Sequence, residues 1–259
     1  MDTIPGLEVC RAMSSTVRAI APDEASAGQQ PLMEVRFSPF GVWYEIDSWW
    51  EGEFLERTMQ GAFSKTIKES RDSIRSLFNH GYDPQIGDKV LGTIEDLRED
   101  PDTAVGDVRL FDTFYVRELL PGLEAGQYGS SMRMRVIKEE WNDEPGVSDH
   151  NPRGIPERTI LEVRLMEFGP VTWPANGAAT TAVRSTTDDF YERMAARDPQ
   201  RIAELTRARE ARTPLTAAGS STVRAAGAAN DDTDEPTDGH SGGPTQAQRR
   251  ERAYPNLKE

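Results

Sequence analysis

The amino-acid sequence predicts an α+β fold, built on a small barrel or strongly bent sheet with a few surrounding helices. Three observations lead to this prediction. Short runs of β-branched and apolar residues recur throughout residues 14–185. Two segments between these runs change to helical spacing. All five tryptophans lie before residue 186, so the residues that could fill a hydrophobic core are concentrated in this part of the chain.

The predicted strands are rich in β-forming residues, which in most cases alternate with polar ones. Residues 90–97 and 104–111 flank the turn signal Arg-Glu-Asp-Pro-Asp and are predicted to pair as a hairpin. Residues 160–168 alternate strongly and are predicted to form a core strand. The other predicted strands are residues 16–20, 32–37, 40–44, 73–78 and 130–137.

Two helices are predicted among these strands. Within residues 54–70, Met59, Phe63 and Ile67 fall four apart, which places them on one helical face. Residues 113–125 form the second predicted helix. Between the later strands, residues 142–156 hold three prolines and two glycines and are predicted to form an exposed loop.

The chain divides into four predicted parts. Residues 1–13 form an N-terminal extension, and residues 14–185 form the main domain. Residues 186–212 are a helical linker, in which Asp198-Pro199 supplies an N-cap and a first-turn proline. Residues 213–259 contain few large apolar residues and are predicted to be a disordered, low-complexity tail, because burial there cannot offset the entropy cost of ordering.

Composition argues against several classes of partner. The net charge of -14 argues against binding to nucleic acid or to an anionic membrane surface, which would require clustered basic residues. No apolar run approaches the roughly 20 residues of a membrane span, and the start lacks a signal-peptide pattern. The one cysteine, Cys10, cannot form an intrachain disulfide and is interpreted as an incidental thiol. No zinc-binding or nucleotide-binding motif is present, so no metal or cofactor is expected.

Of the three histidines, His80 is the best candidate for a general base. It follows an apolar strand and precedes Gly81, and a strand end holds a side chain firmly at the rim of a sheet. His150 lies in the Pro/Gly-rich loop and His240 in the predicted tail. The alternative interpretation of His80 is a turn histidine without a function.

A serine near the start of a predicted strand is a candidate nucleophile. Ser130 and Ser131 follow Gly129, a pattern that by itself is often only turn chemistry. A serine becomes reactive when a nearby base accepts its proton, so either serine would need a histidine within hydrogen-bond reach.

Glu167 shares one face of an apolar strand with Val163 and Leu165. A buried carboxylate costs several kcal/mol unless it has a partner. His80 is one candidate partner, which Glu167 would orient. The alternative is a rim salt bridge with an arginine such as Arg164 or Arg135.

Five short motifs occur in a characteristic order along the chain. They are Phe54-x-Glu56 with Gly61-Ala62-Phe63, then Asn79-His80-Gly81, then Ile86 to Gly92, then Gly129-Ser130-Ser131, and then Glu167 to Asn176. Together they resemble the prohead serine protease of HK97-like tailed phages, a family related in fold to the herpesvirus capsid maturation protease. The resemblance covers roughly residues 14–185, which would then be the protease domain.

The resemblance implies a bent β-barrel with surrounding helices and a serine endopeptidase activity. In this resemblance, His80 falls on the family's base, Ser131 on its nucleophile and Glu167 on its acidic third member. The expected substrates are the major capsid protein and the scaffold, cleaved inside the assembling prohead in the host cytoplasm, and self-association into a homo-oligomer is left open. Arg133 departs from the family, which often has a small residue at this position, so it either points to solvent or alters the substrate groove.

Two other functions compete with an active protease. One is an assembly or scaffolding protein that retains the protease fold without its chemistry, which the helical and low-complexity end of the chain favours. The other is an unrelated small β-barrel binding domain, which would require the order of the motifs to be coincidental. Retention of all three candidate residues favours the enzyme.

A six-residue segment occurs twice in the chain. Ser-Ser-Thr-Val-Arg-Ala stands at residues 14–19 and again at 220–225, with a looser copy at 180–185. Small residues around one valine and one arginine make an extended peptide that a protease groove can accept. We hypothesise self-cleavage at Val223-Arg224-Ala225, and a second site at Val183-Arg184-Ser185. The alternative is that the upstream copies are edge strands and the downstream copy is chance.

Overall fold

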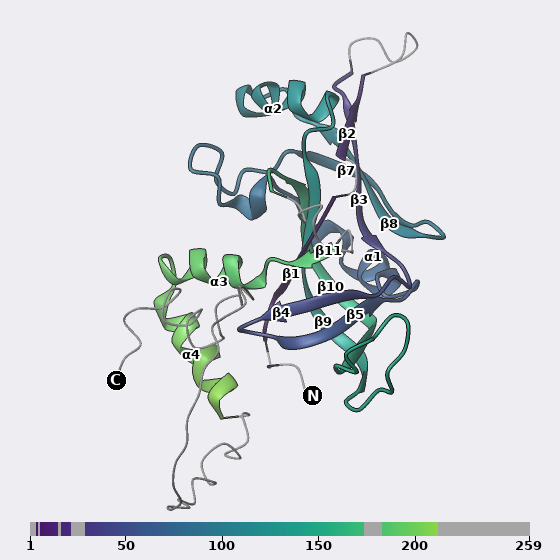
Figure 1. Ribbon diagram of the computed structural model, residues 1–259. Coiled ribbons are helices and arrows are strands. Elements are labelled where there is room, and N and C mark those ends of the chain that lie inside the picture. The colour runs from purple at the N-terminus through teal and green to yellow at the C-terminus, as the bar shows by residue number, and fades with distance from the viewer. Residues whose placement is uncertain (1–3, 5, 15–16, 22–28, 174–182, 212–259) are drawn as a thin grey trace, which may run out of the picture.

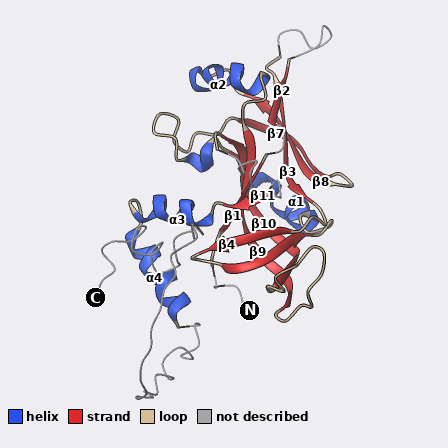
Figure 2. Ribbon diagram, in the orientation of Figure 1, coloured by secondary structure: helices blue, strands red, loops and turns tan. Residues whose placement is uncertain are grey.

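The computed structural model describes residues 4, 6–14, 17–21, 29–173 and 183–211 (Figure 1). Most of its strands belong to one large sheet; Figure 2 draws the strands of both sheets in red. Six strands of this sheet pair in the following spatial order: β11 (Val183–Ser185), β1 (Val9–Met13), β9 (Gly129–Asn142), β10 (Glu157–Val171), β5 (Gly52–Thr58) and β4 (Tyr44–Ser48). The short strand β6 (Arg75–Ser76) pairs with β10 beside this path.

A second sheet of four strands packs against the large one. Its order is β2 (Val17–Ile20), β3 (Leu32–Pro39), β8 (Thr103–Leu110) and β7 (Gly92–Glu99), all antiparallel neighbours. The helices of the described residues are α1 (Ser64–Ser70), α2 (Phe114–Glu124), α3 (Thr187–Ala195) and α4 (Pro199–Glu210). In Figure 1, α3 and α4 lie together at the left of the sheets, below α2.

The two sheets share one hydrophobic core. Phe37 of β3 stacks on Phe168 of β10 with ring centroids 4.9 Å apart, and Phe63 meets Phe37 edge-on. Gly106 of β8 leaves room for this stack, because a Cβ atom there would lie 2.3 Å from the Phe168 ring. Aromatic contacts of this kind add to the stabilisation from burial alone, so they hold β3 and β8 against β10.

Strands β9 and β10 form the centre of the large sheet. They are the longest strands, with 14 and 15 residues, and they pair antiparallel from Gly129 and Val171 at one end to the exposed loop 143–156 at the other. The Gly129 end of β9 and the Val171 end of β10 are buried. Side chains in the buried halves of β9 and β10 therefore project from hydrogen-bonded backbone in the protein interior.

A buried cluster of charges joins β1, β5 and β10. The guanidinium of Arg11 contacts the carboxylates of Glu56 and Glu51, both at 2.6 Å. Arg158 contacts Glu56 at 3.0 Å, and the Tyr44 hydroxyl donates to Glu56 at 2.7 Å. All five side chains are almost fully buried. Buried charged side chains are tolerated when each one is paired with an opposite charge and hydrogen-bonded, as these are.

The predicted α+β class is confirmed, and the predicted hairpin is β7–β8. The described strands pair along an open path and not in a closed ring, so the predicted barrel is not confirmed. Residues 54–58 of the predicted first helix are part of β5, and the helix begins only at Ser64. Pairing of β5 between β4 and β10 overrides the local spacing there, because backbone hydrogen bonds on both sides outweigh a weak helical preference.

The structure also differs from the predicted division of the chain. Strand β1 lies within residues 1–13, the predicted extension, and pairs with both β9 and β11. In the predicted linker 186–212, α3 buries Phe190 and Tyr191 in the common core. Residues 213–259, predicted to be a disordered tail, lie outside the described residues.

Candidate active site

Strand alternation separates the two neighbouring serines of β9. The Ser130 hydroxyl donates to the Arg36 carbonyl oxygen at 2.7 Å, toward the second sheet. The Ser131 hydroxyl lies on the other face, 2.7 Å from Nε2 of His80 and 2.9 Å from the carbonyl oxygen of Arg11. Of the two serines, only Ser131 therefore reaches a histidine.

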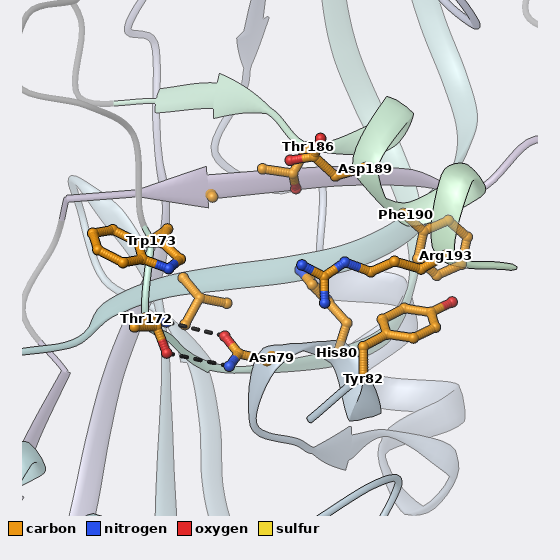
Figure 3. Close-up of a pocket in the computed structure, with 11 residues that line it drawn as sticks. Asn79, His80, Tyr82, Thr172, Trp173, Thr186, Asp189, Phe190 and Arg193 are labelled. Carbon is orange, nitrogen blue, oxygen red and sulfur yellow. Dashed lines mark hydrogen bonds between the residues drawn. The ribbon is translucent and has the colours of Figure 1, made fainter. Parts of the chain in front are cut away.

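His80 belongs to a tight turn, Asn79–Gly81, that follows β6. Asn79 and His80 have φ angles of 47° and 58°, in the left-handed region, and Gly81 has 76°. This conformation costs roughly 1–2 kcal/mol for a residue with a side chain, so the surroundings must hold it. The Asn79 amide does so: it accepts from the Thr172 N–H at 3.0 Å and donates to the Thr172 hydroxyl at 3.2 Å (Figure 3).

The segment just before this turn lies unusually close to β10. A Cβ atom at Gly169 would lie 2.0 Å from the carbonyl oxygen of Leu77, which no side chain could tolerate without movement. Leu77 in turn donates its N–H to the Phe168 carbonyl at 3.2 Å. The glycine lets the segment that carries His80 rest directly on the strand that carries Glu167.

Glu167 completes the set of predicted residues. Its carboxylate, only 1% exposed, lies 2.5 Å from Nδ1 of His80. The two arginines weighed as alternative partners lie elsewhere, since Arg135 contacts Glu8 at 2.8 Å and Arg164 is exposed. The arginine nearest to Glu167 is Arg133, at 3.8 Å. The structure thus brings His80, Ser131 and Glu167 together, from three separate parts of the chain.

This arrangement can activate a hydroxyl. When the Nδ1–H of His80 donates to Glu167, the lone pair of Nε2 is directed at Ser131. An imidazole in this state can accept the Ser131 proton, and the adjacent carboxylate stabilises the positive charge that results. The geometry is therefore that of a hydrogen-bonded nucleophile, base and orienting acid.

A cavity of about 440 Å³ opens beside His80. The start of α3 forms one wall of it with Thr186, Asp189, Phe190 and Arg193. In Figure 3, Arg193 reaches from α3 toward His80. Sequence reasoning did not find this wall, because the α3 segment carries no catalytic motif; its one signal was the pair of large aromatic residues at 190–191.

The remaining candidates lie away from this site or are unreactive in it. His150 bonds to Glu157 at 3.0 Å and stacks on Trp43, and His240 lies outside the described residues. Cys10 is fully buried, and its burial, followed by the nearby charge of Glu167, raises the pKa of its thiol well above the ordinary value. A protonated thiol is a poor nucleophile. In the described part of the chain, no group of three or more His, Cys, Asp and Glu side chains could hold a metal ion.

Comparison with models of protein families matches residues 33–193 to the caudovirus prohead serine proteases, over more than half of the chain. This chain belongs to that family. The match begins in β3 and ends within α3, so α3 is part of the region that prohead proteases share. The predicted family is confirmed.

Among solved structures, the chain is similar to the capsid assembly protease gp21 of bacteriophage T4, with 16% sequence identity and a TM-score of 0.39. The similarity covers 65% of this chain and 97% of that chain. Comparison with curated protein sequences gave no match. Within the described residues, no helix of this prohead protease is long and apolar enough to cross a membrane.

Proposed function

We propose that this chain is an active serine endopeptidase that cleaves the major capsid protein and the scaffold inside the assembling prohead, in the host cytoplasm. The observation that carries the proposal is the pair of hydrogen bonds linking Ser131 to His80 and His80 to Glu167, at 2.7 and 2.5 Å. Membership of the prohead protease family supports the assignment of peptide hydrolysis to these residues.

The proposed reaction uses His80 twice as a base. In the first half, Nε2 of His80 takes the Ser131 proton while Oγ attacks the peptide carbonyl carbon. The tetrahedral intermediate then expels the amine, which receives that proton, and an acyl-enzyme remains. In the second half, His80 deprotonates a water molecule that attacks the ester, and the proton returns to Ser131 as the new carboxyl end leaves. Glu167 holds His80 in place throughout and offsets the imidazolium charge.

We propose that the substrate chain binds in the cavity beside His80. Exposed Trp173 on one side and α3 on the other leave it open to solvent, and a peptide laid in it would pass beside the base. Ser131 itself is 1% exposed, so the substrate must come close to β9 for attack to occur.

The competing function, a capsid assembly protein without activity, predicts no reactive serine. A fluorophosphonate probe distinguishes the two, because it labels only a serine that a base has activated. We expect labelling of Ser131 in the folded chain, located by peptide mass spectrometry. His80→Ala should lower the labelling rate by about two orders of magnitude or more, whereas His150→Ala, the matched control, should leave it unchanged. An unlabelled folded wild type would favour the assembly protein.

We also propose that the enzyme cleaves its own chain near Val223-Arg224-Ala225. Two of the three related segments are already paired in sheets, since residues 17–20 form β2 beside β3 and residues 183–185 form β11 beside β1. Both are outermost strands of their sheets, as the alternative interpretation expected. A protease binds an extended segment by its free backbone groups, so pairing in a sheet argues against cleavage at these two copies. The third copy lies outside the described residues.

N-terminal sequencing of fragments tests the self-cleavage proposal. Purified wild type, after long incubation, should yield a new terminus within residues 222–226, and Ser131→Ala should not. Replacement of Arg224 by glutamate should move or remove this terminus. An intact chain in a preparation that labels fully with fluorophosphonate would contradict self-cleavage at this site.

A further inference from the structure

Arg133 lies two residues after Ser131 on β9 and therefore on the same face of the sheet. Its neighbours across the sheet are Glu167 on β10 and Cys10 on β1. The position that departs from the family pattern is thus next to the carboxylate that contacts His80. Arg133 does not project to solvent, since its side chain is only 21% exposed.

Three contacts hold the guanidinium of Arg133. Its Nε atom lies 3.8 Å from Glu167, and its NH1 atom lies 3.8 Å from Glu8. The guanidinium carbon lies 5.2 Å from the centre of the Phe190 ring of α3, within the range of a cation–π contact. Helix α3 thus helps to fix a positive charge beside the catalytic carboxylate.

The distances show how this charge can act. At 3.8 Å the Nε–H does not form a hydrogen bond to Glu167, and this buried atom has no hydrogen-bond partner in the described structure. The Glu167 oxygen that contacts His80 therefore does not also accept a hydrogen bond from Arg133. The attraction between the charges persists at this distance, because both side chains are largely buried and water screens them weakly.

We propose that Arg133 is an electrostatic positioning residue that acts through Glu167. Its charge attracts the Glu167 carboxylate and so helps to fix the group that orients His80. Loss of this charge would therefore change the electrostatic surroundings of the His80–Glu167 pair, on which activation of Ser131 depends. The inference rests on the proposed function for its catalytic consequence, but the electrostatic effect itself exists whether or not the chain is active.

Other ionisable groups surround the same site. They are Glu8 and Cys10 at β1, Tyr82 and Asp88 near the histidine turn, and Asp189 and Arg193 on α3. All of them remain when Arg133 is replaced, so a comparison of variants isolates the charge at position 133.

Titration of His80 by NMR tests the inference directly. The chain has only three histidines, so His150→Gln and His240→Gln identify the His80 signals. In Arg133→Met, we expect the His80 titration to move to higher pH than in wild type, because a nearby positive charge has been removed. Arg133→Lys, which keeps the charge, should stay close to wild type. Arg135→Met is the matched control, because Arg135 lies on the same strand face but contacts Glu8 and not Glu167.

The rate of fluorophosphonate labelling against pH gives the catalytic readout. On the acidic side of the profile, the expected rise lowers the rate for Arg133→Met by about threefold to tenfold. Arg133→Gln provides a second neutral variant if the methionine variant does not fold. A neutral folded variant with an unchanged His80 titration would overturn the inference. If replacing Arg133 shifts the His80 titration but the wild type is not labelled, the proposed function would be contradicted instead.

Discussion

Replacement of Ser131 by alanine is expected to abolish both fluorophosphonate labelling and peptide cleavage, with a loss on the order of 10⁴-fold or more. The reason is geometric, because the Ser131 hydroxyl lies 2.7 Å from Nε2 of His80. No other hydroxyl contacts that nitrogen within the described residues. The measurement is the initial rate of capsid-protein or scaffold cleavage by purified variants of equal folded concentration.

Ser130→Ala is the matched control for this experiment. Ser130 is equally buried and adjacent in sequence, but its hydroxyl donates to the Arg36 carbonyl. Its loss should cost stability by about 1 kcal/mol, with most of the activity retained. An inactive Ser130→Ala together with an active Ser131→Ala would mean that the nucleophile is assigned to the wrong serine.

Replacement of Glu56 by glutamine is expected to destabilise the fold by about 3–5 kcal/mol at neutral pH. Glu56 is fully buried between Arg11 and Arg158, so the neutral amide leaves two buried cations without full compensation. Urea unfolding followed by circular dichroism measures the loss. Glu53→Gln on the same strand is the control, because the Glu53–Arg153 pair is about half exposed and contributes little. A similar loss in both variants would contradict the importance of burial.

The stabilisation from Glu56 should also depend on pH. Burial alone would raise the pKa of Glu56, but the charge and hydrogen bonds of Arg11, followed by Arg158 and Tyr44, lower it to about 2 from 4.5. A folded-state pKa below the unfolded value means that the carboxylate stabilises the fold fully above pH 4.5. This contribution falls as the pH drops from 4.5 toward 2. The difference in unfolding free energy between wild type and Glu56→Gln should therefore be smaller at pH 3.5 than at pH 7.

This ion cluster also lies next to the proposed active site. Arg11 contacts Glu56 through its side chain, and its backbone carbonyl lies 2.9 Å from the Ser131 hydroxyl. The paired charges hold β1 beside β9, so the strand that neighbours Ser131 is fixed by the same contacts that stabilise the sheet.

The predicted family and the α+β class came from patterns that are local in the chain. Ordered motifs such as Asn79-His80-Gly81 and the alternation of residues 160–168 are visible without a structure. The boundaries were less well predicted. Residues 54–58 of β5 were predicted as part of a helix and β1 as part of an N-terminal extension, because pairing with strands far away in the sequence decides both.

By itself, the sequence determined the family and the residue types of the site, a histidine, a serine and a glutamate in a set order. Only the tertiary structure decided that Glu167 contacts His80 while Arg135 contacts Glu8, and that Ser131 and not Ser130 faces the base. It also placed Arg133 and α3 beside this group. The physical reason is that these contacts depend on strand register and on close approach, as at Gly169, and both are set by backbone pairing between distant segments.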